Sequence, residues 1–150
     1  MNWNEWYAEH ALLAAKKSKD STQVGAALIG PDGVVRLTSF NGIPKGVRDL
    51  PERRERPEKY PWVQHAERNL MNFAAKHGIA TDGCTVYVTH FPCSQCAGGL
   101  IQAGIRKVMI GDGQTSMPPR EFEVAEIMFR EAGVPVSRFR CEEQSELPFG

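Results

Sequence analysis

The sequence lacks several features that would each place it in a large class of proteins. It has no charge surplus, because 18 Lys and Arg balance 18 Asp and Glu, whereas proteins that grip a long phosphate backbone are usually basic. It has no internal repeats and no run near the roughly 20 apolar residues of a membrane span. Its first residues are charged throughout and contain no long apolar stretch. We therefore expect a cytoplasmic protein that binds a small ligand, not a membrane or a long nucleic acid.

Cysteines are also few, and their spacing is informative. Of the four, Cys93 and Cys96 form a C-x-x-C pair, while Cys84 and Cys141 are isolated. Without a secretory leader, such a pair indicates a metal or redox site rather than a disulfide framework. Hydrophobic residues make up 41% of the 150 residues, which is enough for the core of one domain over residues 1–150.

Hydrophobic periodicity predicts an α/β fold. The helices are expected over 3–17, 62–77, 92–103 and 120–132, and the strands over 24–29, 34–40, 85–89, 106–110 and 134–139. Pro31-Asp32-Gly33 predicts a hairpin turn, and residues 41–61 predict a long loop. Strands and helices alternate after the hairpin, which predicts a mixed five-stranded sheet with helices on both faces and parallel fourth and fifth strands.

Two short motifs carry the chemistry. His65-Ala66-Glu67 supplies an imidazole and a carboxylate, and Pro92-Cys93-Ser94-Gln95-Cys96 supplies two thiolates. One His and two Cys are three zinc ligands, which leaves the fourth tetrahedral position for water. The Glu67 carboxylate is then placed to move protons to and from that water. The alternative for C-x-x-C is a structural zinc knuckle or a redox pair.

The predicted helices place the ligands at helix starts. We expect His65 in the first turns of the 62–77 helix and Cys93 at the start of the next helix. Helix N-termini carry partial positive charge, which favours a thiolate at Cys93. Cys96 follows three residues later and faces the same side. Two helix starts would therefore converge on one Zn²⁺.

The order H-x-E…P-C-x-x-C resembles the signature of zinc deaminases that hydrolyse the exocyclic amine of cytosine or adenine. Residues from about 15 to 110 resemble the deoxycytidylate (dCMP) deaminase family more specifically. The matching stretches are Ser18–Ala26, Phe40–Val47, Lys59–Asn69 and Ile101–Ile105. The resemblance implies the cytidine-deaminase fold, a three-layer αβα sandwich, and commonly a homo-oligomer. It implies hydrolysis of dCMP to dUMP with release of ammonia.

The resemblance also implies substrate contacts. Asn41 matches an asparagine that hydrogen-bonds the ligand, although Asn-Gly is itself a turn signal. The Ala66 backbone N–H matches the donor to the pyrimidine carbonyl. His90 and Phe91 directly precede Pro92-Cys93 and are expected to line the site, with a packed or surface residue as the alternative for His90. Tyr60 lies in one of the matching stretches and is predicted to contact the substrate.

The predicted loop contains a basic segment with donors that a nucleotide phosphate needs. Its basic residues are Lys45, Arg48, Arg53, Arg54, Arg56 and Lys59. Lys45 is predicted to contact substrate. Because four acidic residues interleave with these cations, a solvated charged loop is the alternative reading. In the dCMP deaminase family this region also helps to bind deoxycytidine triphosphate (dCTP), so a dCTP-type effector is a further implied partner.

Three other functions stay open from the sequence. Family members often offer a tyrosine after the fourth strand, where this chain has Gly111–Ser116, so the substrate of the deaminase is alternatively another small base or nucleoside, such as cytidine, deoxycytidine or guanine. An enzyme that edits nucleic acid is disfavoured by the zero net charge. A non-catalytic zinc module would need no Glu67.

Overall fold

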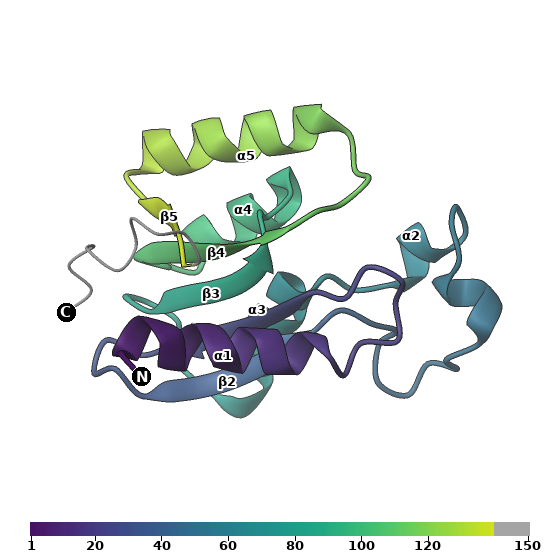
Figure 1. The fold of residues 1–150 in the computed structure, drawn as a ribbon, viewed down its shortest axis with the longest axis horizontal. Helices are drawn as coiled ribbons and strands as arrows, with labels where there is room; N and C mark the ends of the chain where they lie inside the picture. The colour runs from purple at the N-terminus through teal and green to yellow at the C-terminus, as the bar shows by residue number, and fades with distance from the viewer. Residues whose placement is uncertain (140–150) are drawn as a thin grey trace.

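Residues 1–139, which a computed structural model describes, form one five-stranded sheet in the order β2-β1-β3-β4-β5 (Figure 1). The strands are β1 (Gly25–Ile29), β2 (Val35–Phe40), β3 (Thr85–His90), β4 (Lys107–Gly113) and β5 (Val136–Arg138). β1 pairs antiparallel with both β2 and β3, and β4 pairs parallel with both β3 and β5. The predicted hairpin and the parallel fourth and fifth strands are confirmed.

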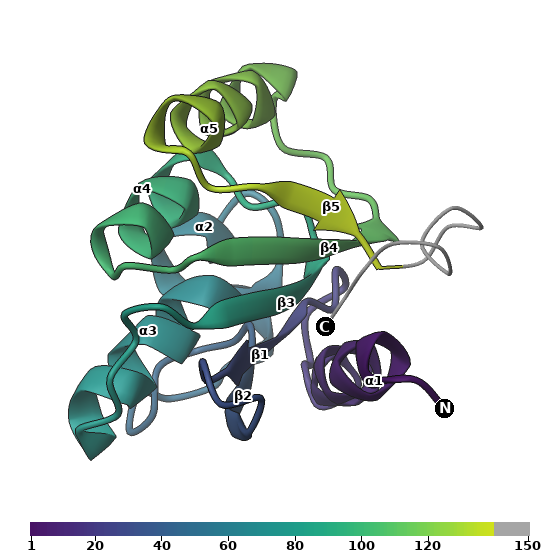
Figure 2. The ribbon, with the colours of Figure 1, turned by 90° about the vertical axis from the view of Figure 1, so that its left-hand side faces the viewer.

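Side chains alternate between two hydrophobic cores, one on each face of the sheet. In β3, Val86 and Val88 face one core, and Tyr87 faces the other. The first core is completed by α3 (Ala66–His77), α4 (Ser94–Gln102) and α5 (Pro119–Ala132), and the second by α1 (Trp3–Ala15). Figure 2 shows α1 alone on its side of the sheet. The predicted αβα layering is therefore confirmed.

The predicted helix over 62–77 is wrong at its beginning. Val63 is extended, and Gln64 forms an isolated antiparallel bridge with Gly42, through N–H···O contacts of 2.8 and 3.1 Å. These bonds hold the chain out of the helix until His65, the N-cap residue of α3, whose ψ is 151°. The histidine thus lies before the first helical turn. The predicted end is confirmed, because Gly78 follows with φ +65°.

The predicted 41–61 loop contains two short helical turns, η1 (Pro51–Arg54) and α2 (Lys59–Trp62). The bounds of β4 and β5 also differ from those predicted. β4 continues to Gly113, and β5 covers Val136–Arg138 instead of 134–139. Cys141 and the acidic tail lie outside the described residues. Within residues 1–139, no helix is both long enough and apolar enough to span a membrane.

The contact between α1 and β1 requires glycine at position 25. A Cβ there would overlap the carbonyl oxygen of Ala11 and the backbone nitrogen of Ala15, both in α1. Since backbone atoms cannot swing away, Gly25→Ala should push α1 off the sheet and lower the free energy of unfolding by about 1–3 kcal/mol. The measurement is denaturant unfolding monitored by circular dichroism.

The matched control is Gly99→Ala in the middle of α4, where an added Cβ meets nothing within 4 Å. Alanine at such a helical position should stabilise by about 0.5–1 kcal/mol. Equal effects of the two substitutions would contradict the close approach of α1.

Candidate metal centre and active site

Three potential metal ligands converge where β3 ends. His65 stands just before α3, Cys93 is the N-cap residue of α4, and Cys96 lies in the first turn of α4. His65 Nδ1 is 3.5 Å from Cys93 Sγ and 3.4 Å from Cys96 Sγ, and all three ligand atoms lie within 4.8 Å of one another. Within residues 1–139 they are the one such group of three or more His, Cys, Asp or Glu side chains.

The spacing of these atoms fits a tetrahedral ion. With Zn–S of about 2.3 Å and Zn–N of about 2.0 Å, tetrahedral zinc separates its N and S ligands by about 3.5 Å, close to the two distances observed. Two thiols and one imidazole are ligands that zinc prefers. Cys84 takes no part, because its thiol contacts the Ala80 carbonyl at 3.4 Å inside the core. The described residues therefore provide three ligands suited to a tetrahedral ion.

These three groups shift one another's pKa values. The pKa of Cys93 is lowered, mainly because Cys96 hydrogen-bonds to its sulfur, and the pKa of Cys96 is raised for the same reason. The Cys93 hydrogen bond raises the pKa of His65. Negative charge thus gathers at the Cys93 sulfur, beside the N-terminus of α4.

Glu67 lies in the first turn of α3, and its side chain is buried at 5% exposure. It is not among the three convergent ligands, but it lines the same cavity as His65 and Cys93. Burial raises the pKa of Glu67 to about 7. A carboxyl with such a pKa exchanges protons readily near neutral pH, as general acid–base chemistry requires.

The cavity above these groups contains most of the predicted substrate contacts. Its lining includes Asn41, Tyr60, Ala66, His90 and Phe91. Lys45 does not line this cavity, and its ammonium lies 5.7 Å from the centre of the Phe73 ring in α3, so its predicted substrate contact stays a prediction. The aromatic ring draws the lysine to the outside of the helix.

Asn41 lines the cavity and also hydrogen-bonds to the protein backbone. Its Oδ1 accepts from the Val24 N–H at 2.9 Å, and its Nδ2 donates to the Thr22 carbonyl at 2.8 Å. The Asn41 side chain therefore fixes the segment that leads into β1. One amide hydrogen and one oxygen lone pair remain for a ligand, so the predicted ligand contact stays a prediction.

His90 and Phe91 form a second wall. Thr89 Oγ1 lies 2.8 Å from His90 Nδ1, and burial lowers the pKa of His90, so the ring is neutral at pH 7. Phe91 packs edge-on against Phe122 and Phe129 of α5. These contacts fix both side chains before any ligand binds.

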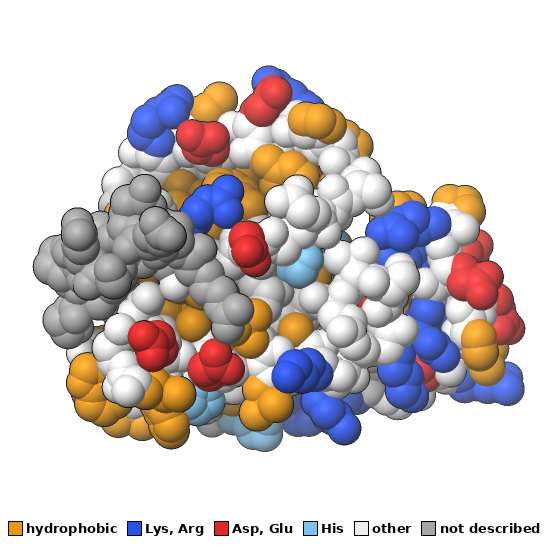
Figure 3. Space-filling view, viewed as in Figure 1, with side chains coloured by type: hydrophobic (Ala, Val, Ile, Leu, Met, Phe, Trp, Pro, Cys, Tyr) orange, Lys and Arg blue, Asp and Glu red, His pale blue; other side chains and the backbone are white. Residues whose placement is uncertain are grey.

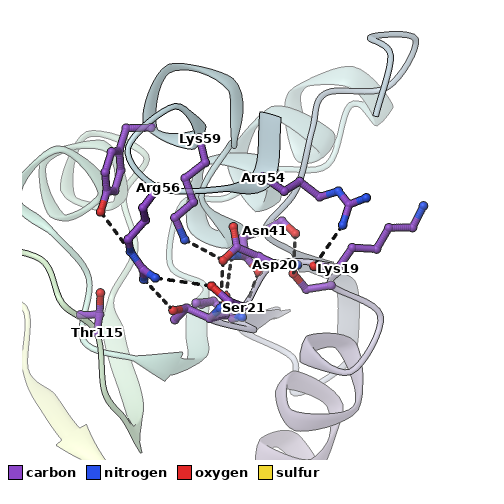
Figure 4. A network of polar contacts seen from close by, with 12 residues as sticks. Lys19, Asp20, Ser21, Asn41, Arg54, Arg56, Lys59 and Thr115 are labelled. Atoms are coloured by element: carbon purple, nitrogen blue, oxygen red, sulfur yellow. Dashed lines mark hydrogen bonds and ion pairs between the residues drawn. The ribbon is translucent and has the colours of Figure 1, made fainter. Parts of the chain in front are cut away.

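The sequence interpretation missed the polar residues at the outer end of the cavity (Figure 4). Lys59 and Asp20 form a buried ion pair of 2.7 Å, with side-chain exposures of 8% and 1%. Arg56 and Thr22 line the cavity beside them. Lys59 and Arg56 were recognised only as members of a basic segment. No sequence pattern joins them to residues 20–22, more than 30 positions earlier.

Removal of one partner of this buried ion pair should be strongly destabilising, because the other charge would stay buried without a counter-ion. In Lys59→Met, Asp20 would keep only the Thr22 N–H on Oδ1, while Oδ2 is buried without a partner within the described chain. We expect the free energy of unfolding to fall by about 3–5 kcal/mol. Denaturant unfolding measures this loss.

Two further variants check that interpretation. Adding Asp20→Asn to Lys59→Met removes the unpaired carboxylate charge and should recover most of the lost free energy of unfolding. Arg54→Gln breaks a more exposed pair with Asp49 and should cost about 0–1 kcal/mol. Equal losses in Lys59→Met and Arg54→Gln would show that burial of the pair does not matter.

Comparison with known protein families identifies the family of this chain. Residues 1–112 match the family described as the cytidine and deoxycytidylate deaminase zinc-binding region. The chain belongs to this family. Its relatives include the deoxycytidylate deaminases of Mus musculus and Homo sapiens, each 37% identical over 147 residues, covering 93% of this chain and 80% of theirs.

A solved structure of a dCMP deaminase has the same fold as this chain. The dCMP deaminase of cyanophage S-TIM5, in complex with dCMP and dUMP, superposes with a TM-score of 0.74 at 27% identity. The match covers 89% of this chain and 94% of the phage protein. The phage protein thus shares the fold described above, and the chain, as a member of the family, is an enzyme of the deaminase type.

Proposed function

We propose that this protein is a zinc-dependent dCMP deaminase, which converts dCMP and water to dUMP and ammonia. The observation that carries the proposal is the convergence of His65, Cys93 and Cys96 in one cavity with a buried carboxyl, Glu67, that is not part of the ligand group. A closed structural site would need four protein ligands. The relatives named deoxycytidylate deaminase, and the phage structure with dCMP and dUMP, support the choice of substrate.

His65, Cys93 and Cys96 would hold the zinc. A zinc ion with three protein ligands supplies a water activated as a nucleophile near neutral pH. The protein keeps these ligands in place through structure, because His65 is fixed by the Gln64–Gly42 bridge and both thiols belong to the start of α4. The site therefore needs little rearrangement to bind the ion.

Glu67 would move the protons. It takes one proton from the attacking water and gives it to the ring nitrogen next to the amine-bearing carbon. It then passes the second proton of that water to the leaving amine, which departs as ammonia. A group that alternately accepts and donates needs a pKa near the working pH, which burial provides here.

The Ala66 backbone N–H would position the pyrimidine. As the first residue of α3, Ala66 has an N–H without an intrahelical acceptor. It lines the cavity between the metal ligand His65 and the proton carrier Glu67. A pyrimidine carbonyl that accepts from this N–H would hold the base in the same cavity as both groups.

Substitution of the proton carrier tests the mechanism separately from the metal. In Glu67→Gln the amide fills the same space but cannot take up a proton, so we expect kcat for dCMP to fall by about 10²- to 10⁴-fold while bound zinc remains one per chain. Ammonia release and metal analysis measure the two quantities.

Cys96→Ser is the contrasting variant and should lose zinc and activity together. Undiminished turnover by Glu67→Gln would overturn the proposed role of Glu67. Loss of zinc in Glu67→Gln would instead make Glu67 a metal ligand.

A deaminase of another small base or nucleoside is the second candidate. The observation in its favour is the cavity wall after β4, where Thr115, Ser116 and Met117 stand in the loop that lacks a tyrosine. Parallel assays with dCMP, deoxycytidine, cytidine, cytosine and guanine separate the two candidates. Ammonia release from any of the others but not from dCMP would decide for the second.

Three further expectations complete the proposal. A homo-oligomer is supported by the exposed indoles of Trp3 and Trp6, which are 64% and 46% exposed on α1 and so are not held in the core. A dCTP-type effector stays a prediction from the family resemblance, and a cytoplasmic location stays a prediction from the composition of the chain. Sedimentation of the protein with and without dCTP measures the first two.

A further inference from the structure

The helix that carries both thiols begins without a side-chain cap of its own. Cys93 is the N-cap residue of α4, but its side chain forms no capping hydrogen bond and belongs to the group of metal ligands. Serine, threonine, aspartate or asparagine usually fills this position, because the first backbone N–H groups of a helix have no intrahelical acceptor. Groups from outside α4 must therefore hold its first turn.

Glu121 of α5 supplies one such group. Its Oε1 accepts from the Ser94 hydroxyl at 2.7 Å and from the Ser94 backbone N–H at 3.3 Å. A carboxylate at this place also interacts favourably with the partial positive charge of the α4 N-terminus. Because Ser94 follows Cys93 directly, one carboxylate fixes the backbone beside the first thiol.

Arg68 of α3 holds the next residue of the same turn. Its Nη2 donates to Gln95 Oε1 at 3.0 Å, and its positive charge acts on His65, Glu67 and Cys96. Figure 2 shows α4 lying between α3 and α5. The two residues between the cysteines are therefore hydrogen-bonded to two different neighbouring helices.

We propose that Glu121 and Arg68 position the two thiols for zinc by holding Ser94 and Gln95. Neither Glu121 nor Arg68 belongs to the ligand group or lines the cavity, so both act through the backbone of α4. Residues that orient metal ligands from outside typically change metal affinity by about 10- to 100-fold. This inference rests on the proposed function, because it takes the three convergent ligands to bind zinc.

The same contacts also pack α4 against its neighbours, so a role in stability alone is the competing explanation. Such a role would lower the free energy of unfolding but leave the Kd for zinc and the ligand geometry unchanged. A positioning role would raise the Kd, because the thiols would have to be ordered at the moment the ion binds.

The test measures the Kd for zinc by competition between the loaded enzyme and a chromophoric chelator of known affinity. In Glu121→Ala we expect the Kd to rise by about 10- to 100-fold, because Ser94 loses both hydrogen bonds to the carboxylate. Glu121→Gln keeps an acceptor oxygen at the same place and should stay within about threefold of the wild type. The visible absorption of Co²⁺ bound in place of zinc reports the ligand geometry and should change in Glu121→Ala alone of these two.

The matched control removes another carboxylate from α5. Figure 3 shows acidic and basic side chains together on the surface over this helix, at the top of the view. Glu123 is exposed there and pairs with Arg120 at 3.6 Å. Glu123→Ala should therefore leave both the Kd for zinc and the Co²⁺ spectrum unchanged.

Arg68→Met tests the exposed side of the turn. We expect the Kd for zinc to rise by about 3- to 10-fold, the range for one lost hydrogen bond. Gln95→Ala should raise the Kd in the wild type but add nothing in Arg68→Met, since both changes remove the same contact. If Glu121→Ala does not fold, these two variants decide the question.

A lower free energy of unfolding in Glu121→Ala and Arg68→Met, with the Kd for zinc unchanged, would overturn the inference and leave the stability role. An equal rise of the Kd in Glu123→Ala would overturn it as well. A wild type that binds no zinc would overturn the inference and the proposed function together. A wild type that holds zinc but deaminates no substrate would overturn the proposed function alone, and the zinc measurements would still decide on Glu121 and Arg68.

Discussion

The antiparallel bridge between Gly42 and Gln64 determines where the histidine stands. Without these two hydrogen bonds, we expect the helix at Trp62 to continue through residue 65. The rotation of about 100° per residue in an α-helix would then direct the His65 side chain away from the thiols. The bridge keeps the chain extended for three residues and delivers the imidazole to the first turn of α4. The metal centre therefore depends on a contact between the end of the hairpin and the entry to α3, both distant in sequence from either cysteine.

The sheet brings the remaining groups to the same edge. β3 and β4 are parallel, so His90 and the loop after β4 emerge together, and β1 runs the other way, so its beginning lies beside them. Asn41 then ties the end of β2 to the residues that enter β1. Groups that are up to about a hundred residues apart in the chain become walls of one cavity because strand direction places their ends together.

Sequence patterns revealed the groups whose spacing is local. His65 and Glu67 are two positions apart and Cys93 and Cys96 are three, so chemistry and spacing were visible together. The Lys59–Asp20 pair was hidden, since no periodicity links residues 39 positions apart. The position of Lys45 outside the cavity lining was not visible either, because charge alone does not show whether a lysine lies toward a cavity or over an aromatic ring. The start of α3 was misplaced because the bridge that delays it is a tertiary contact.

Different structural elements form the two ends of the cavity. The ligands and Glu67 belong to helix starts packed on the sheet, where position varies little. The outer wall is formed by two segments, residues 20–22 and 56–60, which are joined by polar contacts, with the Lys59–Asp20 pair as the buried part. Because Asp20 neutralises Lys59, the charge that remains at the mouth belongs to Arg56.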